Sequence, residues 1–324
     1  MKCESPRKIN KIAVTGATSP IGTALISECL KSDIEVMAFI NPDSPRRENV
    51  PVSSKVRVIE CGLENFGNCE PGEEADAFVH LAWSSTAGAA ARNNLEAQAK
   101  NIGYSLDAVH LAKKMNCRVF LGAGSQAEYG RTKETLTEET EPLPETGYGI
   151  AKLCAGQLTR LACRQEGIEH IWTRILSAYG EYCNPNTVLN YTLLELLNGR
   201  TPLLTAGEQI WDFIYVGDVA RAILAVLNLG GDGETYVIGS GSSKPLREFL
   251  LAAGELVNKD ITLGLGAKPY PDQAVMHLSC DISKLKTDTG FAPEISFEEG
   301  ILRTVSWLKE QEKIGERDDG FKLL

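Results

Sequence analysis

The feature that most constrains this chain is a regular alternation of two kinds of segment over its first 180 residues. Short runs of β-branched and other apolar residues alternate with longer stretches in which apolar residues recur every three or four positions. The short runs are typical of buried strands, and the longer period is that of an amphipathic helix. Such alternation produces parallel βαβ units, so the sequence predicts an α/β fold with a doubly wound parallel sheet. The predicted strands are KIAVTG, IEVMAFI, VRVIE, DAFVHLA, CRVFLGAGS and HIWTRIL.

The segment VTGATSPIGTALIS, residues 14–27, lies where the first predicted strand passes into the first predicted helix. Gly16 and Gly22 are typical of a tight turn in which the helix N-terminus offers free N–H groups to a pyrophosphate. Ser19 stands where a further glycine is expected, and Pro20 removes one backbone donor. A plain strand–turn–helix junction is the alternative interpretation. The cofactor contacts predicted in this loop are Gly16, Thr18, Ser19, Ile21 and Gly22.

The alternation gives way to scattered short elements after about residue 180, which predicts a smaller α/β substrate domain interleaved with the first domain. We expect the Rossmann-type dinucleotide-binding domain to comprise 1–177 together with roughly 210–240. The substrate domain is expected to comprise roughly 178–209 and 241–315. The remaining residues, 316–324, are predicted to be a charged tail.

Charge and composition exclude several classes of function. The formal net charge is −10 and no segment is strongly basic, so we expect no nucleic-acid partner. No run reaches the roughly 18 apolar residues of a membrane span, and the first residues lack the apolar core of a signal peptide. We therefore expect a cytoplasmic protein without a membrane partner. The cysteines show no Cys-x-x-Cys motif and no histidine at ligand spacing, which predicts no metal site. The nine cysteines are at positions 3, 29, 61, 69, 117, 154, 163, 183 and 280.

The segment YGIAK places Tyr148 and Lys152 four residues apart, on one face if the segment is helical. A free tyrosine titrates near pH ~10, and lowering its pKa to about 7 takes roughly 4 kcal/mol. A neighbouring ammonium and a cationic nicotinamide supply such stabilisation, which lets the phenol exchange protons at neutral pH. Upstream, Ser125 ends a predicted strand at the sheet edge where open α/β sheets bind ligands. These three side chains are the predicted catalytic group.

In combination, these motifs resemble those of the extended short-chain dehydrogenase/reductase family, in its branch of nucleotide-sugar epimerases, dehydratases and 4-ketoreductases. The resemblance covers nearly the whole chain. It implies a catalytic trio of Ser125, Tyr148 and Lys152, a nicotinamide cofactor and a nucleotide-sugar substrate, with a homodimer as one possible assembly. The matching positions are Thr15, Gly16, Gly22, Ala82, Asn101, Ser125, Tyr148, Lys152, Arg174 and the segments AYG and DFIYVGDVA.

The same resemblance assigns further binding roles to residues outside the loop and the trio. Lys152 is expected to touch the nicotinamide ribose as well as to act in catalysis. The other cofactor contacts that it implies are Leu81, Ala82, Asn101 and Tyr148. The implied substrate contacts are Ser84, Gln126, Ser177 and Trp211.

The end of the second predicted strand bears on the choice between NAD and NADP. NAD enzymes of this family usually place an acid there for the ribose 2′-hydroxyl, whereas this chain has Ile40 and Asn41. Arg46 and Arg47 follow and are predicted to meet a 2′-phosphate, so NADP is favoured over NAD. Asp43 is a late candidate for the missing acid, and a solvated loop is the alternative role of the arginines.

The residues after Ser125 bear on the reaction. Dehydratases of this branch carry an acid pair directly after the catalytic Ser or Thr, whereas this chain has Gln126 and Ala127. The sequence therefore favours a 4-ketoreductase, with a 4-epimerase that retains its NAD as the alternative. A reductase of other carbonyls and a non-catalytic dinucleotide sensor are the remaining interpretations.

The substrate side departs from the family pattern as well. Relatives often place two arginines on the nucleotide diphosphate, and this chain lacks both, with Trp211 at one of the positions. Either Lys268 or Arg247 replaces them or the substrate carries no diphosphate. Trp211 is predicted either to pack in the core or to stack on a base or sugar.

Overall fold

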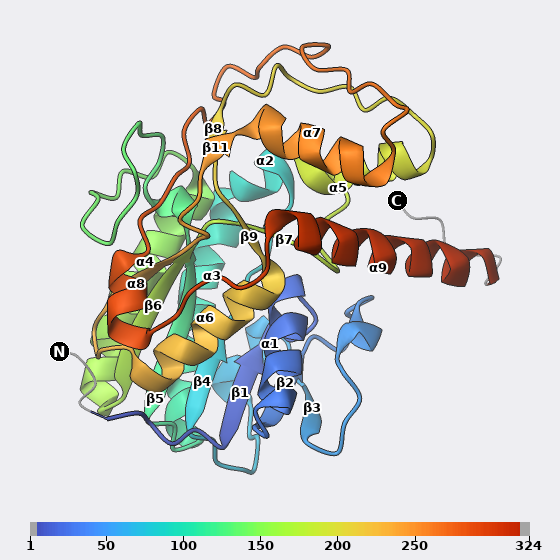
Figure 1. The fold of residues 1–324 in the computed structure, drawn as a ribbon. Coiled ribbons are helices and arrows are strands. Elements are labelled where there is room, and N and C mark those ends of the chain that lie inside the picture. Colours follow the sequence, from blue (N-terminus) through green and yellow to red (C-terminus); the bar gives the residue numbers. More distant parts are fainter. Residues whose placement is uncertain (1–4, 318–324) are drawn as a thin grey trace.

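A seven-stranded parallel sheet forms the centre of the molecule (Figure 1). The computed structural model describes residues 5–317, with side chains up to residue 311 in the last helix. All six predicted strands are present, and a seventh follows later in the chain, so the predicted doubly wound parallel sheet is confirmed. The strand order is β10-β6-β5-β4-β1-β2-β3. The strands are β1 (Lys11–Thr15), β2 (Glu35–Ile40), β3 (Val56–Glu60), β4 (Ala77–His80), β5 (Val119–Ser125), β6 (Glu169–Ile175) and β10 (Thr235–Ile238).

Helices cover both faces of this sheet, which explains why the central strands are continuously apolar instead of alternating. On one face, α1 (Pro20–Lys31) packs against α6 (Val216–Leu229), and both lie in front of the sheet in Figure 1. On the other face, α3 (Leu95–Lys114) packs against α4 (Gly147–Glu166). The strand order changes direction between β1 and β4, and open sheets of this kind bind ligands at the carboxyl ends of the strands beside that point.

The start of α4 places the predicted tyrosine and lysine. Thr146 caps this helix, because its Oγ1 accepts a hydrogen bond from the Gly149 backbone N–H at 3.1 Å. Gly167 ends the helix in the left-handed conformation with a φ of 71°. Tyr148 and Lys152 therefore lie in the first two turns of α4, next to the carboxyl end of β5.

A second group of elements lies over the carboxyl ends of the strands, at the top of Figure 1. Its core brings together residues from several helices and short strands that are far apart in the sequence. One helix of the range 241–315, which was expected to belong to the substrate domain, lies elsewhere: α8 (Ser283–Thr289) packs against α6 and β10 of the sheet. The elements of this group are β7 (Ser177–Tyr179), α5 (Val188–Leu197), β8 (Ile210–Trp211), β9 (Phe213–Tyr215), β11 (Lys244–Pro245), α7 (Leu246–Val257) and α9 (Phe297–Arg317).

Short helices fill some of the connections: η1 (Arg47–Asn49), η2 (Leu63–Asn68), α2 (Gly88–Arg92) and η3 (Gln126–Glu128). Most of the predicted tail, 316–324, lies outside the described residues, and residues 316–317 are the last of α9.

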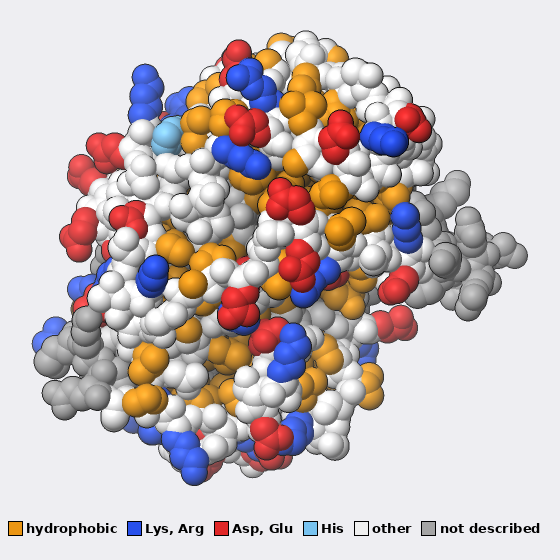
Figure 2. All heavy atoms as spheres, viewed as in Figure 1, with side chains coloured by type: hydrophobic (Ala, Val, Ile, Leu, Met, Phe, Trp, Pro, Cys, Tyr) orange, Lys and Arg blue, Asp and Glu red, His pale blue; other side chains and the backbone are white. Residues whose placement is uncertain are grey.

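The surface agrees with the charge of the sequence. On the face drawn in Figure 2, acidic and basic side chains are interspersed and no continuous basic area is present. Over residues 5–317, no helix combines the length and the apolar character needed to cross a membrane. The same residues contain no group of three or more His, Cys, Asp or Glu side chains that is arranged to hold a metal ion.

Candidate active site

A cavity of about 950 Å³ lies along the carboxyl ends of the strands. One half of its wall runs from the loop after β1 to the end of β2 and to η2, and we call this the cofactor half. The other half is formed by β7, β8 and the start of α5, and we call this the substrate half. Ser125, Tyr148 and Lys152 lie between the two halves and line the cavity.

The loop after β1 has the shape that a pyrophosphate cradle requires. Gly16 has a φ of +68°, and a Cβ added there would be 2.8 Å from the Ala82 backbone nitrogen. A Cβ at Gly22 would overlap the Gly16 carbonyl oxygen. Both positions therefore need glycine, and Gly16 lines the cavity whereas Gly22 does not.

Ser19 and Pro20, the two residues that depart from the expected glycine-rich pattern of this loop, both have local structural roles. Ser19 is the N-cap of α1, and its Oγ accepts a hydrogen bond from the Gly22 backbone N–H at 3.1 Å. Pro20 follows at the first helical position, where its missing N–H costs least. Ser19 and Pro20 both line the cavity, as do the predicted contacts Thr18 and Ile21.

The structure separates the two arginines predicted to meet a 2′-phosphate. Arg46 lines the cavity together with Asn41, whereas Arg47 does not and forms an ion pair with Glu60 at the end of β3. The Asn41 side chain shapes the connecting loop, because its Oδ1 accepts a hydrogen bond from the Asp43 backbone N–H at 3.0 Å. Of the pair, Arg46 is therefore the cation available to a cofactor.

Lys152 is almost completely buried between β5 and α4. Its Nζ donates a hydrogen bond to the Ala123 carbonyl oxygen at 2.6 Å and lies 3.7 Å from the centre of the Trp83 ring. Burial lowers the pKa of Lys152 to about 7. The protein thus holds the Lys152 side chain protonated less firmly than a free lysine is.

Tyr148 faces Ser125 across the cavity wall. Burial raises the pKa of the Tyr148 phenol, while a hydrogen bond with Ser125 and the positive charge of Arg92 oppose that rise. The Arg92 guanidinium lies 5.0 Å from the centre of the Tyr148 ring. In this environment the phenol holds its proton at neutral pH and is suited to donate it to a developing alkoxide.

Trp83 and Arg92 are site residues that the sequence did not predict. Trp83 lines the cavity, contacts the Tyr148 ring edge-on at 6.1 Å between centroids, and donates from Nε1 to the Gln98 side chain at 2.9 Å. Arg92 lines the cavity from the end of α2. The only available signal was the place of Trp83 between two residues that had been assigned, Ala82 and Ser84.

The predicted cofactor residue Asn101 does not line the cavity. It is buried on α3, where its Oδ1 accepts hydrogen bonds at 3.0 Å from both the backbone N–H and the hydroxyl of Ser84. Its Nδ2 donates to the Ser84 carbonyl oxygen at 3.1 Å. Asn101 therefore shapes the wall from behind, whereas Leu81, Ala82 and Ser84 line the cavity.

The substrate half is poor in charge. Ser177 and Trp211 line it and bond to each other, with Trp211 Nε1 donating to Ser177 Oγ at 2.9 Å. Lys268 and Arg247 do not line it, and the Lys268 ammonium instead lies 4.9 Å from the centre of the Tyr191 ring. The Lys and Arg side chains of the described cavity wall are Arg46, Arg92 and Lys152.

The acid that follows Ser125 most closely in the sequence, Glu128, does not line the cavity. Gln126 lines the cavity and Ala127 does not, while Glu128 is fully buried behind the loop. Glu64, the acid of the described cavity wall, lies in η2 at the cofactor half. The cavity wall thus presents the Tyr148 phenol and the Ser125 hydroxyl without a carboxylate beside them.

The sequence and the structure were compared with known protein families, with characterised relatives and with solved structures. The model of the NAD dependent epimerase/dehydratase family matches residues 12–239. A dTDP-glucose 4,6-dehydratase of Escherichia coli K12 is 28% identical, over 92% of this chain and 92% of its own length.

Two solved structures share the fold. A UDP-glucose 4-epimerase from Thermotoga maritima, solved with UDP-glucose, aligns with a TM-score of 0.83 at 24% identity and covers 93% of this chain and 99% of its own. A UDP-glucuronic acid 4-epimerase from Bacillus cereus, solved with UDP-glucuronic acid and NAD, aligns with a TM-score of 0.81 at 22% identity, with coverages of 93% and 99%.

Proposed function

The chain belongs to the NAD-dependent epimerase/dehydratase family, and we propose that it reduces the 4-keto group of a nucleotide sugar with NADPH. The observation that carries this proposal is the composition of the cavity wall at two places. No carboxylate faces the cavity beside Ser125, where a dehydratase needs one. Asn41 and Arg46 stand at the cofactor half, where an NAD enzyme usually has an acid.

The chemistry that a bound nicotinamide dinucleotide supplies is hydride transfer to the carbonyl carbon. The Ser125 hydroxyl holds the carbonyl oxygen in place, and the Tyr148 phenol donates its proton to that oxygen as it gains negative charge. The nearby Lys152 ammonium stabilises the tyrosinate that remains, because opposite charges at short range favour the ionised phenol. The loop from Gly16 to Gly22 and the side chain of Arg46 hold the phosphates of the dinucleotide.

The substrate half indicates how the rest of a nucleotide sugar binds. Trp211, held by Ser177, offers an aromatic face to a base or sugar. The start of α5 lines the cavity with Thr187, Val188 and Leu189, and free backbone N–H groups at a helix N-terminus suit a diphosphate. The Arg92 guanidinium lies 5.0 Å from the centre of the Tyr148 ring, against 5.9 Å for the Lys152 ammonium, so Arg92 is placed to meet a negative charge on the substrate.

A 4-epimerase is the second candidate, favoured by the likeness to two 4-epimerase structures, one of which contains NAD. An epimerase returns the hydride to the same sugar and so keeps its cofactor through turnover. NAD⁺ released from freshly purified, denatured protein would favour this candidate over the reductase.

The deciding experiment is a panel of 4-keto-6-deoxy nucleotide sugars mixed with NADPH, with the absorbance of NADPH followed over time. Stoichiometric oxidation of NADPH by at least one member supports the reductase, and Tyr148→Phe is the control that should abolish it. If no member oxidises NADPH while a 4-hydroxy nucleotide sugar is converted to its epimer without added cofactor, the reductase proposal is wrong.

We also propose that the enzyme is a homodimer joined through α4. Ile150, Leu158 and Leu161 lie on one face of α4 and are exposed by 54%, 37% and 53%. A helical row of exposed apolar side chains is typical of a face that packs against another helix. Light scattering should give twice the chain mass, and Leu161→Glu should give the mass of one chain; a wild-type monomer would contradict this proposal.

A further inference from the structure

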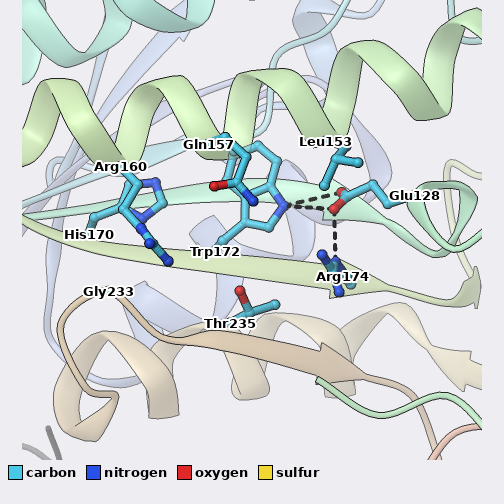
Figure 3. A pocket seen from close by; sticks show the side chains of 10 residues that line it. Glu128, Leu153, Gln157, Arg160, His170, Trp172, Arg174, Gly233 and Thr235 are labelled. Carbon is cyan, nitrogen blue, oxygen red and sulfur yellow. Dashed lines mark hydrogen bonds and ion pairs between the residues drawn. The ribbon is translucent and has the colours of Figure 1, made fainter. Parts of the chain in front are cut away.

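A buried acid lies directly behind the catalytic loop. Glu128 is the last residue of η3, it has no exposed surface and does not line the large cavity, and its carboxylate points toward Trp172 and Arg174 of β6 (Figure 3). A small separate cavity of about 30 Å³ lies beside it. A carboxylate is costly to bury unless hydrogen bonds compensate for the lost water, so its partners indicate what it is for.

Donors from two strands satisfy this carboxylate. Trp172 Nε1 donates to its two oxygens at 3.1 and 3.2 Å, and Arg174 Nε donates to Oε2 at 2.8 Å. The Ser125 backbone N–H donates to Oε1 at 2.8 Å. Because Trp172 and Arg174 stand on β6 and Ser125 ends β5, Glu128 ties the end of the catalytic strand to its neighbour.

Two glycines of β5 make room for this arrangement. A Cβ at Gly124 would overlap both Glu128 Oε1 and Trp172 Nε1, and a Cβ at Gly122 would overlap the Trp172 ring. Neither glycine has a positive φ, so what they provide is space and not an unusual backbone conformation. The end of β5 is therefore shaped to accept this indole and this carboxylate together.

The hydrogen bond to Ser125 reaches the reacting centre. Ser125 has an extended backbone with φ −152° and ψ 151°, and its Oγ accepts a hydrogen bond from the Ala127 backbone N–H at 3.2 Å. Its hydroxyl is also close enough to Tyr148 to oppose the rise in the pKa of that phenol, and Lys152 is anchored on Ala123 of the same strand end. A shift of the Ser125 backbone would therefore move a hydroxyl that contacts the proton donor.

We propose that Glu128 is a positioning residue that fixes the Ser125 hydroxyl against Tyr148 by holding the Ser125 backbone N–H. Trp172 and Arg174 in turn hold Glu128. This inference rests on the proposed catalytic roles of Ser125 and Tyr148. It assigns a purpose to a carboxylate that stands three residues after the catalytic serine yet faces away from the substrate.

The test is a double-mutant cycle with Glu128→Gln and Ser125→Ala, using NADPH and the most reactive 4-keto-6-deoxy nucleotide sugar of the panel. We expect Glu128→Gln to lower kcat about tenfold in the wild-type background, because misplacement of a reacting group is costly, and to leave the KM for NADPH unchanged. In the Ser125→Ala background the same change should cost nothing further, because its effect passes through the hydroxyl that is already absent.

A matched control is Glu138→Gln. Glu138 is a partly buried acid that accepts a hydrogen bond from the Val237 backbone N–H at 3.0 Å, so its replacement removes a similar contact remote from Ser125. It should leave kcat unchanged. An equal loss from Glu128→Gln in both backgrounds, or no loss in either, would overturn the inference, whereas a fully active Ser125→Ala would refute the proposed function itself.

Should Glu128→Gln fail to fold, Trp172→Phe replaces it in the cycle. This change removes one donor to the carboxylate and leaves the ion pair with Arg174 intact. The expected loss in kcat is about threefold, the size of one weakened hydrogen bond, and again only when Ser125 is present. A loss that persists in Ser125→Ala would overturn the inference here too.

Discussion

The cofactor half and the substrate half of the same cavity are built in different ways. The cofactor half comes from strand ends and the loops that follow them, with Gly16 in its wall and a cation at Arg46. The substrate half combines β7, α5 and β8, and it offers aromatic, apolar and hydroxyl groups without a lysine or arginine of its own in the described wall. Under the proposed function, the cofactor half would therefore hold the dinucleotide through backbone shape and charge, whereas the substrate half would select its ligand through shape and stacking, with the charge of Arg92 near the junction.

The largest expected effect is at the junction of the halves. Tyr148→Phe removes the proton donor and should reduce turnover by about 10² to 10⁴, the usual size of a general acid contribution. The Kd for the cofactor should stay nearly constant, because the phenol oxygen is not part of the phosphate cradle. Stopped-flow turnover and calorimetric titration measure the two quantities, and turnover equal to that of the wild type would remove Tyr148 from the mechanism.

The next effect tests the cofactor half alone. Arg46→Ala should weaken NADPH binding by roughly tenfold to a hundredfold, because a charge-assisted hydrogen bond is worth about 1.5–3 kcal/mol, and should leave NADH binding almost unchanged. Arg47→Ala is the matched control, since that side chain is already paired with Glu60. Equal losses for NADPH and NADH, measured by titration, would contradict the preference for NADP.

The substrate half is tested by removing its aromatic face. Trp211→Ala should raise the KM for the nucleotide sugar about tenfold, as expected from the loss of one stacking contact, without a change in cofactor Kd. Ser177→Ala serves as the control, because it removes the hydrogen bond to the indole and keeps the ring. A change in cofactor affinity as large as the change in KM would show that the two halves are not separable.

The smallest effect concerns stability. Below about pH 7 both the folded and the unfolded chain carry a charged Lys152, so folding buries a charge at full cost. Between pH 7 and the ordinary pKa of 10.5 the unfolded chain binds this proton and the folded chain does not, so wild-type stability rises with pH in this window. Lys152→Met should therefore raise Tm by a few degrees at pH 6.5 without cofactor, and by less at pH 9.5.

The control for this measurement is Lys100→Met, which alters an exposed lysine of α3. It should change Tm equally little at both values of pH. A gain for Lys152→Met that is independent of pH would mean that the burial of the ammonium does not lower its pKa in solution.

The comparison of the two halves also shows what the sequence alone could predict. The strands of the sheet could be predicted because a strand produces a short apolar run in the sequence. The placement of Tyr148 and Lys152 in one helix could be predicted because they are four residues apart. Arg46 and Arg47 could not be told apart, since the difference lies in Glu60 on another strand. Asn101 was given a direct role because a motif does not show which way a side chain faces.

Trp83 and Glu128 were missed for a related reason. The role of each depends on contacts with residues distant in the chain, Lys152 for Trp83 and Trp172 with Arg174 for Glu128. The substrate half was the least predictable region, because its wall is assembled from segments that carry no motif of their own.

The positions of the tryptophans give the molecule an optical property. Of the four tryptophans in the sequence, Trp83 lies at the reacting centre against Lys152, and Trp211 lies in the substrate half against Ser177. The Trp172 indole donates a hydrogen bond to Glu128, and Trp307, a residue of α9, packs beside Tyr182. Indole fluorescence changes with the charges and water around the ring, so single replacements of Trp83 and Trp211 by Phe would separate the signals of the two halves. If the proposed function holds, these two signals would report the order in which dinucleotide and sugar enter the cavity.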